Sequence, residues 1–118
     1  MKIREDDSDM TNNESAYELE KRELIAEAPG LRVQVLTLGP GQCVPWHRHT
    51  EISDTFFCLE GEVVLQTRDP ETTLELRAGQ RATVPAKQPH RVSGANDTRC
   101  SFLIVQGVGE YDYLPEPG

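Results

Sequence analysis

The sequence has few cysteines, and their spacing is not that of a redox pair or a cysteine zinc site. Cys43, Cys58 and Cys100 are an odd number without C-x-x-C spacing. The first ten residues, MKIREDDSDM, contain no apolar run of the kind that forms a secretory signal. Together these absences indicate a reducing compartment and predict a cytoplasmic protein.

Basic residues are also scarce. Lys and Arg total 12 against 20 Asp and Glu, which gives a formal net charge of -8. A chain of this charge repels the phosphates of nucleic acids and the headgroups of anionic membranes. The apolar runs are far shorter than the roughly 18 residues of a membrane span. We therefore expect neither a nucleic-acid nor a membrane partner.

The beginning of the chain differs in composition from the rest. Residues 1–14 are polar and acidic, which predicts a mobile leader, and residues 15–118 then form a single domain. The spacing Ser15-x-x-Glu18 is typical of a capping box and predicts a short helix over residues 16–26. A competing interpretation makes residues 23–28 a strand that turns at Pro29-Gly30.

From Leu31 onward, short apolar segments alternate with turn signals such as Gly39-Pro40-Gly41 and Asp69-Pro70. Turns that recur every 8 to 12 residues between β-branched segments are typical of an all-β sandwich or barrel. The predicted strands cover residues 31–38, 42–49, 55–59, 62–67, 73–76, 81–85, 90–94 and 100–105.

Two histidines stand one residue apart in the stretch PWHRHTEISD, residues 45–54. Side chains alternate between the faces of a strand, so His47 and His49 share a face and can converge on one ion. Asp54 can join them only if residues 50–53 turn the chain into a second strand. His90 begins another strand-like segment and is the remaining histidine. Imidazole with carboxylate favours Fe, Mn, Zn, Ni or Co over calcium or magnesium.

The spacing of these residues resembles that of the cupin superfamily, in particular its small single-domain members of the Cupin_2 type. Residues 41–61, Gly41-x5-His47-x-His49-x4-Asp54-x6-Gly61, are similar to the first cupin motif, G-x5-H-x-H-x3-4-E-x6-G. Residues 79–94, containing Gly79-x5-Pro85-x-Lys87-x2-His90, are similar to the second motif, G-x5-P-x-G-x2-H-x3-N. Asp54 replaces the usual glutamate, Lys87 a glycine and Gly94 the final asparagine.

The resemblance implies a double-stranded β-helix, a jelly-roll barrel with a short N-terminal extension. It also implies a divalent transition metal in the barrel, held by His47, His49, Asp54 and His90. Because Asp54 is one methylene shorter than glutamate, three possibilities stay open for it: binding at longer reach, binding through water, or no binding. Glu51 is the rival carboxylate, but it lies in the predicted turn.

Strand alternation and chain proximity also suggest residues that line the pocket. Five were selected, because they share a face with a candidate ligand or flank His90: Cys43, Phe56, Cys58, Gln88 and Val92. We interpret the cysteines mainly as small buried side chains. On the first strand after the leader, Arg32 or Gln34 could reach a bound ligand.

Two functions fit these expectations. The first is a metal-dependent enzyme of oxygenase, isomerase or lyase type that acts on a small organic substrate. The alternative is a non-catalytic module that binds metal and a small ligand, as a sensor or storage domain. The resemblance further implies a homodimer. In either case, metal occupancy should fall as the pH drops through about 6 to 6.5, because imidazoles bind metal only when neutral.

Overall fold

The computed structural model describes residues 2–3 and 17–118. Most of the predicted leader (residues 1 and 4–14) and Ser15 of the predicted capping box lie outside the described residues. Residues 2–3 form β1 (Lys2–Ile3), which pairs antiparallel with the residues around Glu27.

The helix predicted for residues 16–26 is wrong, because this part of the chain contains the strand β2 (Lys21–Ala28). The competing strand interpretation is the correct one. β2 turns at Gly30, where φ is +79°, and pairs antiparallel with the following strand. Arg22 and Leu24 face inward and are buried. Pairing with a neighbouring strand and burial of alternate side chains outweigh the local capping signal.

The strands predicted after Leu31 are all present, with ends within two residues of the prediction. They are β3 (Leu31–Leu38), β4 (Cys43–Arg48), β5 (Ser53–Glu60), β6 (Glu62–Thr67), β7 (Thr72–Arg77), β8 (Arg81–Val84), β9 (His90–Gly94) and β10 (Cys100–Gly107). A short 3-10 turn, η1 (Ala95–Asp97), precedes β10, and a two-residue strand, β11 (Leu114–Pro115), follows it.

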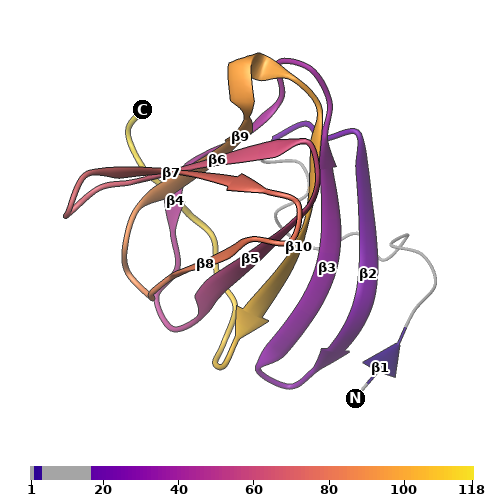
Figure 1. Ribbon diagram of the computed structural model, residues 1–118. Coiled ribbons are helices and arrows are strands. Elements are labelled where there is room, and N and C mark those ends of the chain that lie inside the picture. Colours follow the sequence, from indigo (N-terminus) through magenta and orange to yellow (C-terminus); the bar gives the residue numbers. More distant parts are fainter. Residues whose placement is uncertain (1, 4–16) are drawn as a thin grey trace.

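These strands form two antiparallel sheets. The first has the order β1-β2-β3-β10-β5-β8 and the second the order β11-β4-β9-β6-β7. Figure 1 shows β2 and β3 side by side in one layer, with the β6–β7 hairpin projecting on the other side of the molecule. Because consecutive strands such as β4 and β5 belong to different sheets, the chain repeatedly crosses between the layers. The all-β prediction is confirmed.

Alternate residues of both sheets point inward and form the core. In β5 every second residue from Asp54 to Cys58 is buried, and in β6 Val63 and Leu65 are fully buried. The rings of Phe56 and Phe102 lie 5.5 Å apart between β5 and β10. Core residues such as Phe56 and Phe102 also lie beside buried polar side chains in the barrel interior.

The two departures from the second cupin motif have different structural consequences. Lys87 adopts a positive φ of 75°, where glycine is normally favoured, and its N–H donates to the His49 carbonyl at 2.7 Å. Gly94 lies so close to Thr98 that a Cβ there would be 1.8 Å from the Thr98 carbonyl oxygen. The chain therefore tolerates lysine at the first position and requires glycine at the second.

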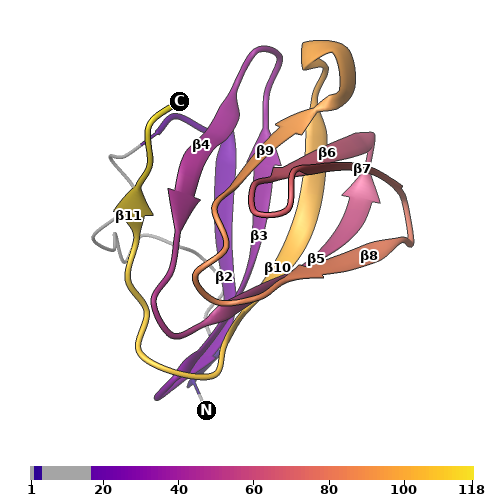
Figure 2. The same cartoon turned by 90° about the vertical axis from the view of Figure 1, so that its left-hand side faces the viewer.

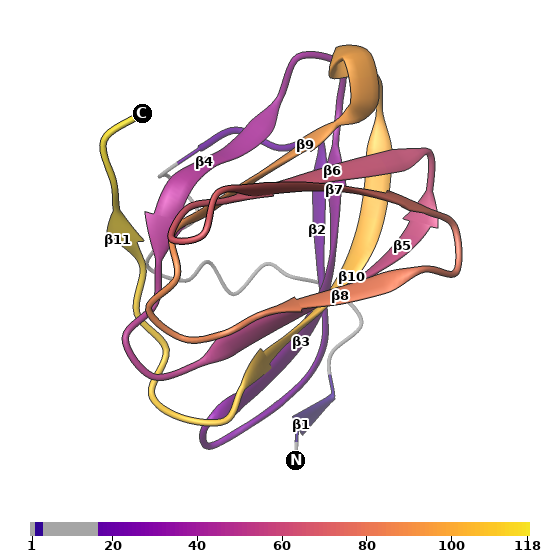
Figure 3. The same cartoon turned by 60° about the vertical axis from the view of Figure 1, so that its left-hand side comes forward.

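The C-terminal segment after β10 packs along the barrel. In Figures 2 and 3 it turns at the end of β10 and runs back beside β4, where β11 pairs antiparallel with Arg48 and His47. Arg48 Nε donates to Glu116 Oε2 at 2.7 Å and Thr50 Oγ1 to Asp112 Oδ2 at 2.6 Å.

No helix in the described part of the chain has the length and apolar character of a membrane span.

Candidate metal centre

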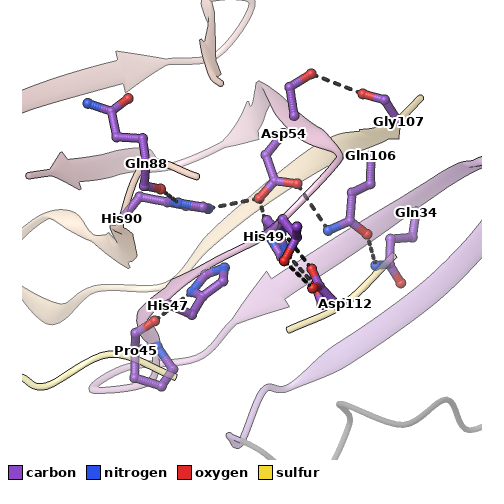
Figure 4. Close-up of polar contacts among 12 residues, drawn as sticks. Gln34, Pro45, His47, His49, Asp54, Gln88, His90, Gln106, Gly107 and Asp112 are labelled. Atoms are coloured by element: carbon purple, nitrogen blue, oxygen red, sulfur yellow. Dashed lines mark hydrogen bonds and ion pairs between the residues drawn. The ribbon is translucent and has the colours of Figure 1, made fainter. Parts of the chain in front are cut away.

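The four side chains named as metal ligands meet inside the barrel. His47 lies in β4, and His49 is the first residue after the end of β4. Asp54 lies in β5, and His90 begins β9. One ligand atom from each lies within 4.8 Å of the others, and all four side chains are buried. These residues are called the His–Asp cluster below, and Figure 4 shows them converging.

Each sheet contributes to the cluster. His47 and His90 are directly opposite each other in the β4–β9 pair of one sheet, and Asp54 comes from β5 of the other. The chain turns after His49, as the sequence predicted, and so carries Asp54 across to face the histidines. The aspartate reaches them despite its short side chain, because its Oδ2 lies 3.0 Å from His49 Nε2 and 2.8 Å from His90 Nε2.

Hydrogen bonds to the backbone fix the tautomers of all three imidazoles. His47 Nδ1 donates to the Pro45 carbonyl at 2.7 Å, and His90 Nδ1 to the Gln88 carbonyl at 2.9 Å. His49 Nδ1 donates to the Asp112 carbonyl at 2.5 Å. Because a carbonyl oxygen can only accept, each Nδ1 carries the proton, and each neutral ring has a bare lone pair on Nε2.

This arrangement leaves the centre of the cluster without a proton when the rings are neutral. The Nε2 lone pairs of His49 and His90 then face the ionised Oδ2 of Asp54, so only added protons or a cation can bring them together. Imidazole nitrogens and a carboxylate oxygen that lie this close together are donor types that would hold a transition metal. The separations of 2.8 and 3.0 Å, and the position of all four ligand atoms within 4.8 Å of one another, are compatible with these residues holding one cation.

Burial and mutual charge shift the pKa values of the cluster in opposite directions. Burial, together with the charge of His90, lowers the pKa of His47 to about 3. Burial also acts to lower the pKa of His49, but the hydrogen bond and charge of Asp54 outweigh it and raise that pKa. Burial acts to raise the pKa of Asp54, and its contacts with His49 and His90 more than reverse this effect. Asp54 is therefore a carboxylate, and His47 is a neutral ring over the physiological range.

The second oxygen of Asp54 has a partner of its own. Gln106 Nε2 donates to Asp54 Oδ1 at 3.1 Å, and Gln106 Oε1 accepts from Gln34 Nε2 at 3.1 Å (Figure 4). Gln34 Oε1 in turn accepts from Arg22 Nη1 at 3.0 Å. All four side chains are buried. Asp54 thus presents only Oδ2 to the histidines.

A small cavity of about 20 Å³ lies beside the cluster. Its lining combines apolar and polar side chains and includes Leu36, Val44, Phe56, Val92, Phe102, Ile104, Tyr17, Gln34, Gln106, Tyr111 and Tyr113, besides three cluster residues. We call it the inner cavity. About 10 to 15 Å³ of such space holds one water molecule, so in this conformation the inner cavity admits only a water-sized ligand.

Of the five residues selected as pocket lining, the structure places two in the wall of the inner cavity, Phe56 and Val92. Cys43 is absent from that wall because the β4–β9 pairing shifts register between Val44 and His47, so Val44 rather than Cys43 faces inward with the histidines. Cys58 lies deeper in the apolar core. Gln88 turns away, and its Nε2 donates to the Arg68 carbonyl at 3.1 Å.

Sequence reasoning missed the aromatic residues that cover the cluster. The Tyr113 ring stacks on His47 with centroids 4.6 Å apart, and the Tyr111 ring lies 5.4 Å from that of His49. Both come from the C-terminal segment, whose alternation in EYDYLP was the available signal. Glu51, the rival carboxylate, is exposed and accepts a hydrogen bond from the Glu110 N–H at 2.9 Å, outside the cluster.

Comparisons with known proteins agree with this architecture. The family model described as "Cupin domain" (Cupin_2) matches residues 34–106. No curated protein shows significant sequence similarity to the chain. An uncharacterized conserved protein with a double-stranded beta-helix domain from Klebsiella pneumoniae subsp. pneumoniae MGH 78578 is 23% identical, with a TM-score of 0.68 over 98% of this chain and 91% of that one. The predicted double-stranded β-helix is confirmed.

Two oxalate enzymes also share the fold. Oxalate oxidase is 15% identical, with a TM-score of 0.65 over 73% of this chain and 46% of its own. Oxalate decarboxylase is 19% identical, with a TM-score of 0.71 over 83% of this chain and 28% of its own. The present chain therefore spans less than half of either enzyme chain. At these identities the likeness shows a common fold but does not show that the activity is shared.

Proposed function

This chain belongs to the Cupin_2 family, and we propose that it binds one divalent transition metal in the His–Asp cluster and acts there on a small organic substrate. The observation that supports the metal is the set of Nε2 lone pairs aimed at one carboxylate oxygen. Fe, Mn, Zn, Ni and Co all accept three imidazoles and a carboxylate. When bound, such an ion supplies a Lewis acid that polarises a ligand oxygen.

The residues around the cluster indicate how the imidazole rings are oriented and how a ligand would reach the metal. The backbone carbonyls hold the imidazole rings in fixed orientations, so little reorganisation accompanies metal binding. Apolar side chains line much of the inner cavity, and Tyr111 and Tyr113 from the C-terminal segment cover the histidines. We infer that a substrate of more than a few atoms displaces this segment before it reaches the metal.

A wider pocket of about 260 Å³, called the outer pocket below, adjoins the inner cavity and provides the approach to it. Gln106 and Tyr111 line both, so they form the partition between them. Arg32 lies in this outer pocket, with its guanidinium 4.8 Å from the centre of the Tyr111 ring. We infer that displacement of the Tyr111 and Gln106 side chains would connect the two spaces.

The experiment that tests the metal site is elemental analysis of protein purified without a histidine tag. We expect about one equivalent of a transition metal in the native protein and loss of that metal in His49→Ala and Asp54→Asn. Glu51→Gln is the matched control, because Glu51 is a nearby acid outside the cluster, and it should retain full stoichiometry. A native protein that takes up no metal, even after incubation with excess Mn²⁺, Fe²⁺ or Zn²⁺, refutes the proposal.

The small size of the inner cavity favours one alternative, a non-catalytic module in which the metal binds water or a very small ligand. Metal-loaded protein that turns over no member of a small-metabolite panel, with and without oxygen, would support this sensor or storage role. A homodimer and a cytoplasmic location also stay predictions. Light scattering of the purified protein and fractionation of the source cells test them.

A further inference from the structure

We propose that Gln106, Gln34 and Arg22 are positioning residues that hold Asp54 as a one-oxygen metal ligand and so set the metal affinity of the cluster. These three residues are called the amide relay below. The inference rests on the proposed metal binding. It concerns residues that lie outside both cupin-like motifs.

The amide relay crosses the first sheet one strand at a time. Arg22 lies on β2, Gln34 on β3, Gln106 on β10 and Asp54 on β5, and these four strands are consecutive neighbours in that sheet. Gln106 is directly opposite Asp54 in the β10–β5 register. The other two steps are diagonal, since Gln34 is opposite Ile104 rather than Gln106. Side chains on the inner face at such diagonal positions are within hydrogen-bonding reach of each other.

The chemistry of arginine gives the relay a single direction. A guanidinium can only donate, so Gln34 must present its Oε1 to Arg22 Nη1. Its Nε2 then points toward Gln106 Oε1, and Gln106 Nε2 is left to donate to Asp54 Oδ1. Flipping either amide would place two donors or two acceptors face to face. Arg22 therefore determines which atom of Gln106 meets the carboxylate.

Because the amide relay is buried, the direction of its hydrogen bonds matters for Asp54. Gln34, Gln106 and Arg22 are 3%, 6% and 8% exposed, and Asp54 is 1% exposed, so solvent does not replace a lost partner. Among residues 17–118, no ion pair involves Arg22, whose other contact is with the Tyr17 hydroxyl at 3.5 Å. Its charge polarises the two amides in the direction that strengthens the last hydrogen bond to Asp54.

The consequence for the metal is geometric. With Oδ1 engaged by Gln106, the carboxylate cannot rotate, and Oδ2 stays between His49 and His90. A shorter acid than glutamate tolerates less rotation before it loses reach, so Asp54 depends on this restraint. Loss of a hydrogen bond that orients a metal ligand typically weakens metal binding by about 10-fold to 100-fold.

The test measures Co²⁺ and Mn²⁺ affinity of the full-length, metal-stripped protein by competition with a chromophoric chelator. We expect Gln106→Leu to weaken Co²⁺ binding by about 10-fold to 100-fold and to change the visible absorption of bound Co²⁺. Gln34→Leu should weaken it in the same direction. The double variant should bind no more weakly than Gln106→Leu alone, because the relay is already cut at its last step.

Thr37→Val is the matched control. Thr37 Oγ1 donates to Ser101 Oγ at 3.3 Å, so this variant also removes a buried side-chain hydrogen bond between β3 and β10, away from the cluster. It should bind Co²⁺ as the native protein does. If Gln106→Leu does not fold, as judged by circular dichroism, Gln34→Leu tests the same relay one step further from the metal.

The outcomes separate the two proposals. Native protein that binds neither of these ions, nor Fe²⁺ or Zn²⁺ in the same assay, refutes the metal site itself. Native protein that binds Co²⁺ while a folded Gln106→Leu or Gln34→Leu variant binds it within twofold of the native affinity refutes the amide relay alone. An equal loss of affinity in Thr37→Val also refutes it, because the effect would then come from general loosening of the sheet.

Discussion

The metal-free protein should lose stability between pH 7.5 and pH 5 because His47 is buried as a neutral ring. Its pKa is lowered from about 6.5 to about 3 on folding. Protonation therefore favours the unfolded chain, so the stability is complete above pH 6.5 and decreases as the pH falls toward 3. Each pH unit below 6.5 costs about 1.4 kcal/mol, which amounts to about 2 kcal/mol at pH 5.

The other members of the cluster require a differential measurement. The pKa of His49 is raised on folding, so its protonation favours the folded protein and offsets part of the loss. The pKa of Asp54 is lowered from 3.8, and its contribution is lost only below that value, outside this window. Replacing His47 with phenylalanine removes its titration and keeps a ring against Tyr113, which stacks on it.

Urea unfolding of both proteins at pH 7.5 and pH 5, followed by circular dichroism with a chelator present, gives the required comparison. The native protein should lose about 2 kcal/mol more than His47→Phe over this pH interval, at equal m-values. If the two proteins lose the same free energy, His47 is not buried as a neutral ring, and its assignment as a preformed neutral ligand fails.

Two further predictions concern the barrel itself. Gly61→Ala should destabilise the protein by at least 2 kcal/mol more than Gly79→Ala, although both residues have positive φ, because a Cβ at Gly61 would be 2.5 Å from a backbone oxygen, whereas no atom lies within 4 Å of a Cβ at Gly79. Thermal unfolding measures the difference, and equal losses of stability would contradict the close packing at Gly61. In a thiol titration of the native protein at pH 8, only Cys43 should react rapidly, because burial raises the pKa of Cys100 to about 11 and also raises that of Cys58. Rapid modification of all three thiols would show that the core opens.

The comparison of sequence with structure is clearest at the histidines. Alternation along a strand and a polar turn were enough to predict that His47, His49 and Asp54 face one another, because both are local properties of the chain. His90 was a candidate as the remaining histidine at the start of a strand-like segment, and the resemblance to the second cupin motif assigned it to the site. The same local logic failed for Cys43, since a register shift between Val44 and His47 reverses the inward face of β4.

The beginning of the domain shows a second limit. A capping-box spacing favoured a helix over residues 16–26, but β3 offers an edge for β2 to pair with, and Leu24 becomes buried when it does. Local propensity could not reveal the partner strand. The competing interpretation as a strand succeeded because it relied on the turn signal at Pro29-Gly30, where the chain does reverse direction into β3.

The sequence by itself determined the strands after Leu31 to within two residues, the identity of the clustered side chains and the family to which the barrel belongs. Only the tertiary structure decided what surrounds them: the amide relay through Gln106, and the cover of Tyr111 and Tyr113 over the histidines. Strand periodicity and turn chemistry act over a few residues, and a linear sequence displays them directly. The relay and the cover depend on the pairing of strands far apart in the chain, which is set by the packing of the whole barrel.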